Sequence, residues 1–553
     1  MKSGANRSLN PDLPHYLGIL NSFSLCKTGM YLYYMCLIIY IKSFTRVKII
    51  KGNEYLYEIT PYYDKEKKQI RQKSKYLGKN LNGVPIKVRS KDLFPKNVLS
   101  HGEFIPLQKI TDCLNLEQIL SEILPAKEIW PVLSMAMNYV IRPRSLNHIQ
   151  SWYEGTILAE DRPGLPLSSQ TLSRILSRIG DSTANLDFSR ALIRRVSASR
   201  TLIYDITSLS SYSQNINLLG YGYNRDGLDL PQVNLSLIID KDLGIPLMYD
   251  VYPGSIVDVS TLKNTIKKIR SQGAKDFTLI MDRGFFSTAN VEELVSSGLS
   301  FIIPPASTLK KVKEAISAIH RSIDDPQYLK LHQKEPLFVM PISIEVGEIC
   351  LKGYAYYDQR REQQERNTLY KRLYDLMDRL NSITLKPWMN PVEVFKETAR
   401  KDARFIEWQA IDGRFEVALK KNAVSQSINK LGKFILLYRG DFSWEECLSL
   451  YRGKDAVEKG FDILKNDIDL MPAHVRTDST LRGYLFVAFL ALILRMKLMN
   501  MMLKAGLGKR YSVEGLLLEL ENIKVMILPD GQRITTEISR KQREILNALD
   551  LCA

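Results

Sequence analysis

The chain has 553 residues, of which 45% are hydrophobic and 25% are charged. This composition excludes a disordered or fibrous chain, and the length predicts several domains. The net charge is +17, from 77 Lys and Arg against 60 Asp and Glu, which favours a polyanion such as nucleic acid as a partner. Six scattered cysteines without a CxxC pair and six histidines without HxxxH spacing argue against a disulfide framework and a zinc site, and a reducing cytoplasm fits.

Residues 1–44 read as an extension of unclear role before a small β unit at 45–92. The extension contains an apolar run at residues 30–41, which is too short for a membrane span of about 20 residues. A second short run, residues 485–494, is flanked by basic residues and predicts a buried core helix. We therefore expect no membrane association. In the β unit, alternating apolar residues around Gly52 and Asn53 predict a hairpin.

Residues 93–190 read as helices and form a candidate DNA-binding region. In the stretch LSSQTLSRILSRIG, Ser168 or Ser169 can cap a helix whose apolar positions recur at helical spacing. Arg174 and Arg178 fall on the outer face of this helix, where they could contact DNA. The alternative is that both arginines simply lie on a solvent-exposed helix face and bind no ligand.

From residue 199 the pattern changes to α/β. Residues 199–305 predict a strand, a hairpin, a helix and a further apolar strand. Residues 306–440 alternate between helices and strands, residues 441–505 read as helices, and residues 506–553 form a last small α/β unit.

Two Asp residues follow apolar strands in the first α/β segment. Asp205 follows the run LIY, and Asp282 follows FTLIM. A carboxylate at the end of a buried strand needs a partner, because its burial without one costs several kcal/mol. A salt bridge to Arg283 or a turn cap before Gly284 would satisfy Asp282 alone, and a hydrogen bond to Thr207 or Ser208 would satisfy Asp205 alone. Two such acids together with a third could instead hold a hard cation, which prefers oxygen ligands.

The third acid is Glu458, in the stretch YRGKDAVEKGFDILKND. On one regular helix Tyr451, Lys454, Glu458 and Lys465 would share a stripe beside an apolar stripe. Glu458 would then lie at the edge of a core with cations beside it. A surface pair between Glu458 and Lys454, four residues apart, is the simpler explanation for this residue alone.

These residues in this order resemble the DDE insertion-sequence transposases, whose third acid lies in a Tyr-x2-Arg-x3-Glu-x6-Lys signature. Tyr451, Lys454, Glu458 and Lys465 match its spacing, with Lys where the family usually has Arg. Asp205 in DIT and Asp282 in MDRGF match the two other acids. The stretches YPGS and RGYLF are also similar, and the resemblance covers residues 46–550.

The resemblance implies an α/β fold with a ribonuclease-H-like catalytic core, at 199–305 and 441–505, interrupted by a mixed α/β insertion domain at 306–440 and preceded by a mainly helical region. It implies that Asp205, Asp282 and Glu458 are catalytic and bind two Mg²⁺ ions, for which Mn²⁺ can substitute. The implied reaction cuts DNA at the element's ends and joins the 3′-OH ends to target DNA.

The expected partner is double-stranded DNA, as terminal inverted repeats and as target, bound by a homodimer in the cytoplasm. Tyr451, Lys454, Lys465 and Arg283 would contact DNA at the cleavage site. Trp388 and Trp408 of the insertion domain and Trp444 beside it are candidate platforms for an unstacked base, although core packing explains each of them. The alternative is a catalytically inactive DNA-binding derivative of a transposase, which a metal-dependent nicking assay would distinguish.

Overall fold

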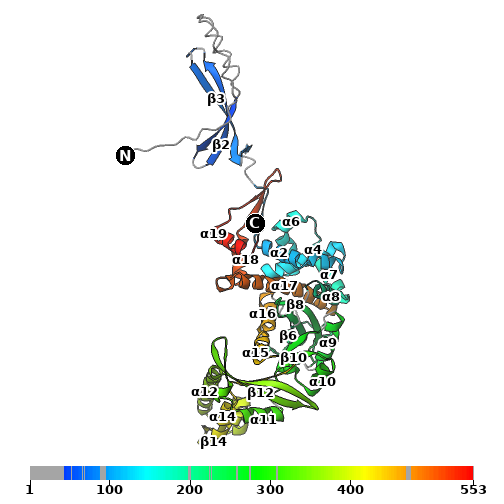
Figure 1. Cartoon of the computed structure of the whole chain (residues 1–553), viewed down its shortest axis with the longest axis vertical. Coiled ribbons are helices and arrows are strands. Elements are labelled where there is room, and N and C mark those ends of the chain that lie inside the picture. Colours follow the sequence, from blue (N-terminus) through cyan, green and yellow to red (C-terminus); the bar gives the residue numbers. More distant parts are fainter. Residues whose placement is uncertain are drawn as a thin grey trace, which may run out of the picture. The chain divides into compact units, whose positions relative to one another are not determined.

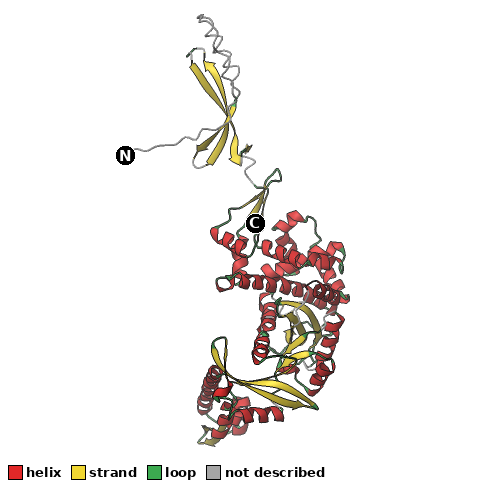
Figure 2. Ribbon diagram, viewed as in Figure 1, coloured by secondary structure: helices red, strands yellow, loops and turns green. Residues whose placement is uncertain are grey.

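The computed structural model shows a mixed α/β protein (Figures 1 and 2). It describes residues 43–50, 53–64, 66–67, 69–81, 83–86, 95–196, 201–213, 215–222, 224–225, 227–256, 260–272, 276–306, 309–468 and 475–551. The chain divides into two compact units, Met1–Asn97 with Met526–Ile534, and Val98–Val525 with Thr535–Ala553. The apolar run at 30–41 lies outside the described residues.

The first unit contains a four-stranded antiparallel sheet in the order β1-β2-β3-β4. Its strands are β1 (Phe44–Ile50), β2 (Asn53–Asp64), β3 (Gln69–Leu81) and β4 (Val84–Ile86). Ile50 pairs with Asn53 at the end of β1, so the predicted hairpin is confirmed.

The second unit begins with a helical layer. Its helices are α2 (Phe104–Cys113), α3 (Leu116–Ser121), α4 (Ala126–Ile141), α5 (Leu146–Glu154), α6 (Ile157–Asp161), α7 (Ser169–Asp181) and α8 (Ala184–Val196). The predicted cap of α7 is confirmed at Ser168, whose hydroxyl accepts a hydrogen bond from the Thr171 backbone N–H. The apolar positions of α7 are buried, as their helical spacing predicts.

Below this layer lies a nine-stranded sheet in the order β11-β12-β13-β16-β10-β9-β6-β7-β8 (Figure 1). The strands are β6 (Thr201–Ser210), β7 (Gln232–Asp240), β8 (Ile245–Pro253), β9 (Thr278–Met281), β10 (Ser300–Ile303), β11 (Leu329–His332), β12 (Glu335–Val346), β13 (Ile349–Tyr357) and β16 (Lys433–Arg439). Strands β6, β9 and β10 are parallel, and the other neighbours are antiparallel. The predicted hairpin of β7 and β8 is confirmed.

Strand β6 carries its side chains alternately to the two faces of this sheet. Tyr204 points to the face of α9 (Leu262–Ser271), where its hydroxyl lies 2.9 Å from Oγ1 of Thr261. The next residue, Asp205, therefore points to the opposite face, against which α16 (Asp455–Asp462) packs. Helix α10 (Thr288–Ser296) follows β9.

Between β10 and β16 the chain forms a helical subdomain together with the outer strands β11 to β13. Its further elements are α11 (Lys310–Ile319), α12 (Gln359–Asn381), α13 (Pro391–Ala399), β14 (Ile406–Ile411), β15 (Arg414–Leu419) and α14 (Lys421–Ile428). Leu376, Phe395 and Phe415 belong to a buried cluster of this subdomain. The subdomain thus has apolar packing of its own.

The chain then returns through α15 (Trp444–Arg452) and α16 to the long helix α17 (Asp478–Lys504), and ends with α18 (Val513–Glu521) and α19 (Arg540–Ala548). Short strands β5 (Asn97–Ser100), β17 (Lys524–Ile527) and β18 (Arg533–Thr535) lie where the chain passes between the two units.

Helix α17 is long and apolar enough to cross a membrane by length and composition alone, but 78% of its most apolar stretch is buried inside the protein. The predicted core helix is therefore confirmed, and it is longer than the apolar run. It crosses α7 closely, since a Cβ atom on Gly180 would lie 1.8 Å from the Ser479 carbonyl oxygen and one on Gly483 would lie 1.9 Å from that of Leu176. Only glycine permits this contact between the two helices.

Candidate active site

Strand pairing brings Asp205 and Asp282 side by side. In the parallel pair of β6 and β9, Tyr204 lies opposite Met281, so the residues that follow them are neighbours as well. Asp282 stands at the end of β9, as predicted. The prediction that Asp205 also ends a strand is wrong, because β6 continues to Ser210. The polar residues after Asp205 remain paired with β7 and are buried, so they do not form a turn.

The two aspartates have the same local arrangement. Asp205 Oδ1 accepts a hydrogen bond from the Ile206 backbone N–H at 2.9 Å, and Asp282 Oδ1 accepts one from the Arg283 backbone N–H at 2.8 Å. The second bond is the cap of a 3₁₀ turn that starts at Arg283. In both residues one oxygen is fixed by the backbone, and Oδ2 remains for another partner.

The third acid comes from a helix that differs from the single regular helix predicted over 451–468. Ser443 and Glu446 form a capping box that starts α15, which ends at Arg452. A tight turn at Gly453 and Lys454 separates it from α16, and the chain continues as a π-helical turn at Ile463–Asp467. The apolar stripe is still buried, since Val457, Phe461, Leu464 and Ile468 are all at most 7% exposed.

The turn places the Lys454 ammonium among the three acids. Its Nζ lies 3.1 Å from Glu458 Oε1, 3.3 Å from Asp282 Oδ2 and 3.8 Å from Asp205 Oδ2. The carboxylate oxygens of any two of these acids are therefore separated by no more than the sum of their two distances to the Lys454 Nζ. Residues that are far apart in sequence thus converge on one cation. Lys454 itself is only 9% exposed.

Burial and charge act in opposite directions on these groups. Burial raises the pKa of Asp205 to about 6, although the nearby Lys454 ammonium favours its ionised form. Burial alone would lower the pKa of Lys454, but the carboxylates of Asp205 and Asp282 outweigh it and hold this pKa above its ordinary value. When all three acids are ionised, the group carries a surplus of two negative charges over the one ammonium.

This arrangement is not a formed metal site. Among the residues that the structure describes, no three His, Cys, Asp or Glu side chains are placed to hold a metal ion. The ammonium of Lys454 lies between the three acids and makes ion pairs with each of them. The group is therefore an acidic cluster that is balanced in part by an internal cation.

The other predicted site residues lie in different surroundings. Tyr451 is half-buried, and burial together with the charge of Asp282 raises its pKa to about 12. Arg283 is exposed beside Asp282. Lys465 lies in the π-helical turn, beyond the regular part of α16. Arg174 is exposed on α7, whereas Arg178 forms an ion pair with the buried Glu128 of α4 and so has a structural role.

A cleft of about 500 Å³ opens beside Asp282 and Tyr451. Sequence reasoning missed three cationic residues that line it, Arg361 from α12, Lys433 from β16 and Arg452 from α15. The only signal in the sequence was their charge, which they share with many surface residues. The cleft thus places Asp282 beside a positively charged wall that could hold a polyanion.

The three tryptophans named above differ in exposure. Trp388 is 76% exposed, and the Lys386 ammonium lies 5.2 Å from the centre of its ring. Trp408 stacks on Phe395 at 4.8 Å, and Trp444 packs at the edge of a buried cluster. Core packing therefore accounts for Trp408 and Trp444, and Trp388 alone offers an open ring.

Comparisons with known protein families and with solved structures each find a similar protein. A family model described as "Transposase DDE domain" matches residues 197–494, a range that contains all three acids. A structural comparison finds the cryo-EM structure of a piggyBac transposase synaptic complex with hairpin DNA, which is 10% identical over 77% of this chain and 82% of that chain, with a TM-score of 0.35. That score is too low to carry an argument. No curated protein matches the chain.

Proposed function

The chain belongs to the transposase family of this DDE domain, whose model covers more than half of its length, and from this premise we propose the reaction that it performs. It cuts DNA at the ends of an insertion sequence and joins the 3′-OH ends to target DNA by metal-dependent phosphoryl transfer. The observation that carries this proposal is the convergence of Asp205, Asp282 and Glu458 on the single ammonium of Lys454.

We further propose that the core is ribonuclease-H-like and is interrupted by an insertion domain, with the boundaries expected from the sequence. The antiparallel order of β6, β7 and β8, with β9 and β10 parallel to β6, supports this assignment. The subdomain between β10 and β16 supports an insertion, because it has its own buried cluster. Its strands β11 to β13 extend the same sheet through β16.

The chemistry of the cluster fits Mg²⁺, with Mn²⁺ as a substitute. All three acids offer carboxylate oxygens, which hard divalent ions prefer, and the surplus of negative charge favours a cation. Asp205, Asp282 and Glu458 would hold two such ions. When bound, the ions would supply an activated nucleophile and stabilise the leaving oxygen at phosphorus. Lys454 competes for the same oxygens, so we expect its side chain to move away from them.

The residues around the acids would bind the DNA strand. Arg283, Arg452 and Lys433 line the cleft beside Asp282, where they can neutralise phosphates. Tyr451 lines the same cleft, and its hydroxyl is protonated at neutral pH, as for an ordinary tyrosine, with a pKa raised further to about 12. Lys454, once displaced from the acids, would add a further cation next to the scissile phosphate. Double-stranded DNA is the proposed partner, and a homodimer in the cytoplasm is the proposed form.

A nicking assay on DNA that carries the element's ends tests the proposal. We expect Asp282→Asn, Asp205→Asn and Glu458→Gln each to reduce Mg²⁺-dependent cleavage by at least about a thousand-fold, because each removes a charged ligand. DNA binding should remain, since it depends mainly on Lys and Arg contacts to phosphate. The matched control is Asp455→Asn, an exposed acid on the same helix. Wild-type protein that binds end DNA but never nicks it would support the inactive derivative instead.

A further inference from the structure

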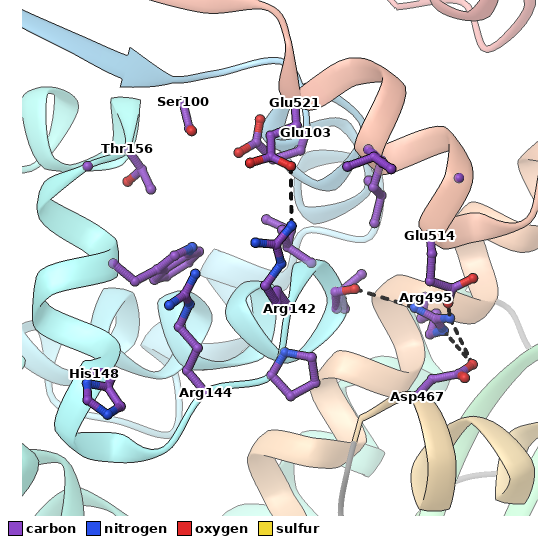
Figure 3. Close-up of a pocket in the computed structure, with 18 of the residues that line it drawn as sticks. Ser100, Glu103, Arg142, Arg144, His148, Thr156, Asp467, Arg495, Glu514 and Glu521 are labelled. Carbon is purple, nitrogen blue, oxygen red and sulfur yellow. Dashed lines mark hydrogen bonds and ion pairs between the residues drawn. The ribbon is translucent and has the colours of Figure 1, made fainter.

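A second site is suggested by a cavity of about 740 Å³ in the helical layer of the second unit (Figure 3). Its lining comes from Ser100 and Glu103 before α2, the end of α4, the loop to α5, α5 and the two residues after it, the π-helical turn, the buried arginine of α17, and α18. Asp205, Asp282 and Glu458 are not part of this lining. The volume is within the range of roughly 300–1,000 Å³ that small-molecule sites occupy.

One wall of the cavity contains a carboxyl group with an unmet hydrogen bond. Glu103 is only 3% exposed, and its Oε2 has no hydrogen-bond partner. Burial raises its pKa to about 7. A buried polar atom without a partner costs free energy, so a donor brought by a ligand would be favourable there.

Two arginines line the cavity from the end of α4 and the loop after it. Figure 3 shows the guanidinium group of Arg142 extending toward Glu103 and Glu521, with Arg144 in the same cavity. Arg142 pairs with Glu521 at 3.5 Å, and both side chains are partly exposed, so the pair is weak enough for an anion to replace it. The backbone N–H of Arg144 donates to Asn138 Oδ1 at 3.0 Å, which fixes the loop, while its side chain is exposed.

The cavity also contains an aromatic surface beside the buried acid and the two arginines. Trp152 of α5 is half-buried, packs on Phe104 with a ring separation of 5.8 Å, and lines the cavity. A planar ring, a buried acceptor and two guanidinium groups within one cavity match the three parts of a nucleotide. The base has a flat face and N–H donors, and the phosphate is an anion that arginine binds well.

We propose that this cavity binds a nucleotide, with its base beside Trp152 and Glu103 and its phosphate at Arg142 and Arg144. The nucleotide is either a free mononucleotide or an unpaired nucleotide of a DNA strand. The second source rests on the proposed function, and the first does not.

The test is titration calorimetry with the full chain in EDTA, so that the result does not depend on cleavage. One arm uses the four deoxynucleoside monophosphates. The other compares a DNA hairpin that has one unpaired 3′ nucleotide with a blunt hairpin of the same stem. Binding in the first arm identifies a free nucleotide as a ligand, and tighter binding of the first hairpin than the blunt one identifies a nucleotide in a strand. A failure in both arms overturns the proposal, whatever the nicking assay shows.

Variants then locate the binding. We expect Arg144→Ala, Trp152→Leu and Glu103→Ala each to weaken binding about ten-fold, in line with the loss of one charged or stacking contact. Lys109→Ala, an exposed cation of α2 that does not line the cavity, is the control and should bind as the wild type does. Thermal melts check that each variant is folded. Arg144 is exposed, so its variant tests the site even where the other two fail to fold. Equal affinity of Arg144→Ala and Lys109→Ala would overturn the proposal.

Discussion

Two buried cations of the second unit, Lys454 and Arg495, are both surrounded by acids, yet they are held in different ways. Arg495 is 3% exposed. Its Nη2 and Nε donate to Asp467 Oδ2 at 2.8 and 3.1 Å, it also contacts Glu514, and its Nη1 donates to the Val140 carbonyl at 3.4 Å. Lys454 is almost as buried, but its contacts with the two aspartates are 3.3 and 3.8 Å long.

The contacts of Arg495 and Lys454 show how a structural ion pair differs from one that a metal ion could replace. The planar guanidinium of Arg495 makes several directed hydrogen bonds that join α4, α17 and α18. The ammonium of Lys454 acts as a point charge that balances three acids without a short bond to either aspartate. Burial is similar in the two cases. The length and direction of the contacts distinguish them, and three experiments can test this distinction.

The largest expected effect is the loss of Arg495. Arg495→Met should lower the free energy of unfolding by about 3 kcal/mol or more, because it removes a buried guanidinium and its hydrogen bonds to Asp467 and to the Val140 carbonyl. Mg²⁺ should not restore this stability. Thermal unfolding with and without Mg²⁺ measures the loss of stability and shows whether Mg²⁺ restores it. The control is Lys497→Met, on the same helix but not buried. A loss below about 1 kcal/mol would remove the contrast between the two cations.

The next effect concerns pH. Because the pKa of Asp205 is raised from 3.8 to about 6, the folded protein binds more protons than the unfolded chain between these values. Its stability should therefore fall as the pH rises from about 4 to about 6, by up to about 3 kcal/mol, and this contribution should be constant above that window. Urea unfolding in EDTA across this pH range should show this decrease in the free energy of unfolding for the wild-type protein and a smaller decrease for Asp205→Asn. Identical pH profiles for the two proteins would contradict the assignment.

The smallest effect concerns metal affinity. Lys454→Met removes the internal competitor, so Mg²⁺ should bind about ten-fold more tightly, which corresponds to about 1.4 kcal/mol. The variant should be less stable than wild type in EDTA and should recover stability when Mg²⁺ is added. Calorimetry and thermal melts measure these changes, with Lys459→Met as the control on the exposed face of α16. Weaker Mg²⁺ binding by Lys454→Met would mean that the ammonium holds the acids in place for the metal.

Local patterns in the sequence predicted local structure well. The hairpin of β1 and β2, the cap at Ser168, the pairing of β7 with β8 and the buried stripe of Val457 and Phe461 all depend on neighbouring residues. The core helix α17 was predicted for the same reason, although its full length was not.

The errors arose where distant residues decide the structure. Asp205 was expected at the end of a strand because it follows an apolar run, but pairing with β7 continues the strand to Ser210. The shared stripe expected for 451–468 required one regular helix, and nothing in the apolar spacing indicated the turn at Gly453 or the π-helical turn. The position of Lys454 among the acids was also missed, because two of its partners lie in β6 and just after β9, far away in the sequence. The family relationship, and with it the identity of the three acids as candidates, could still be inferred from motif order.

The π-helical turn at Ile463–Asp467 would allow the helical register of α16 to change. A π turn holds one residue more than an α turn. If it moved along the chain toward the middle of α16, each residue it passed would advance by one position, which is about 1.5 Å along the axis and 100° around it. If the π turn passed Glu458, the carboxylate of this residue would rotate while the helix remained hydrogen-bonded. Migration of the π turn would thus change the direction of the Glu458 side chain without unfolding α16.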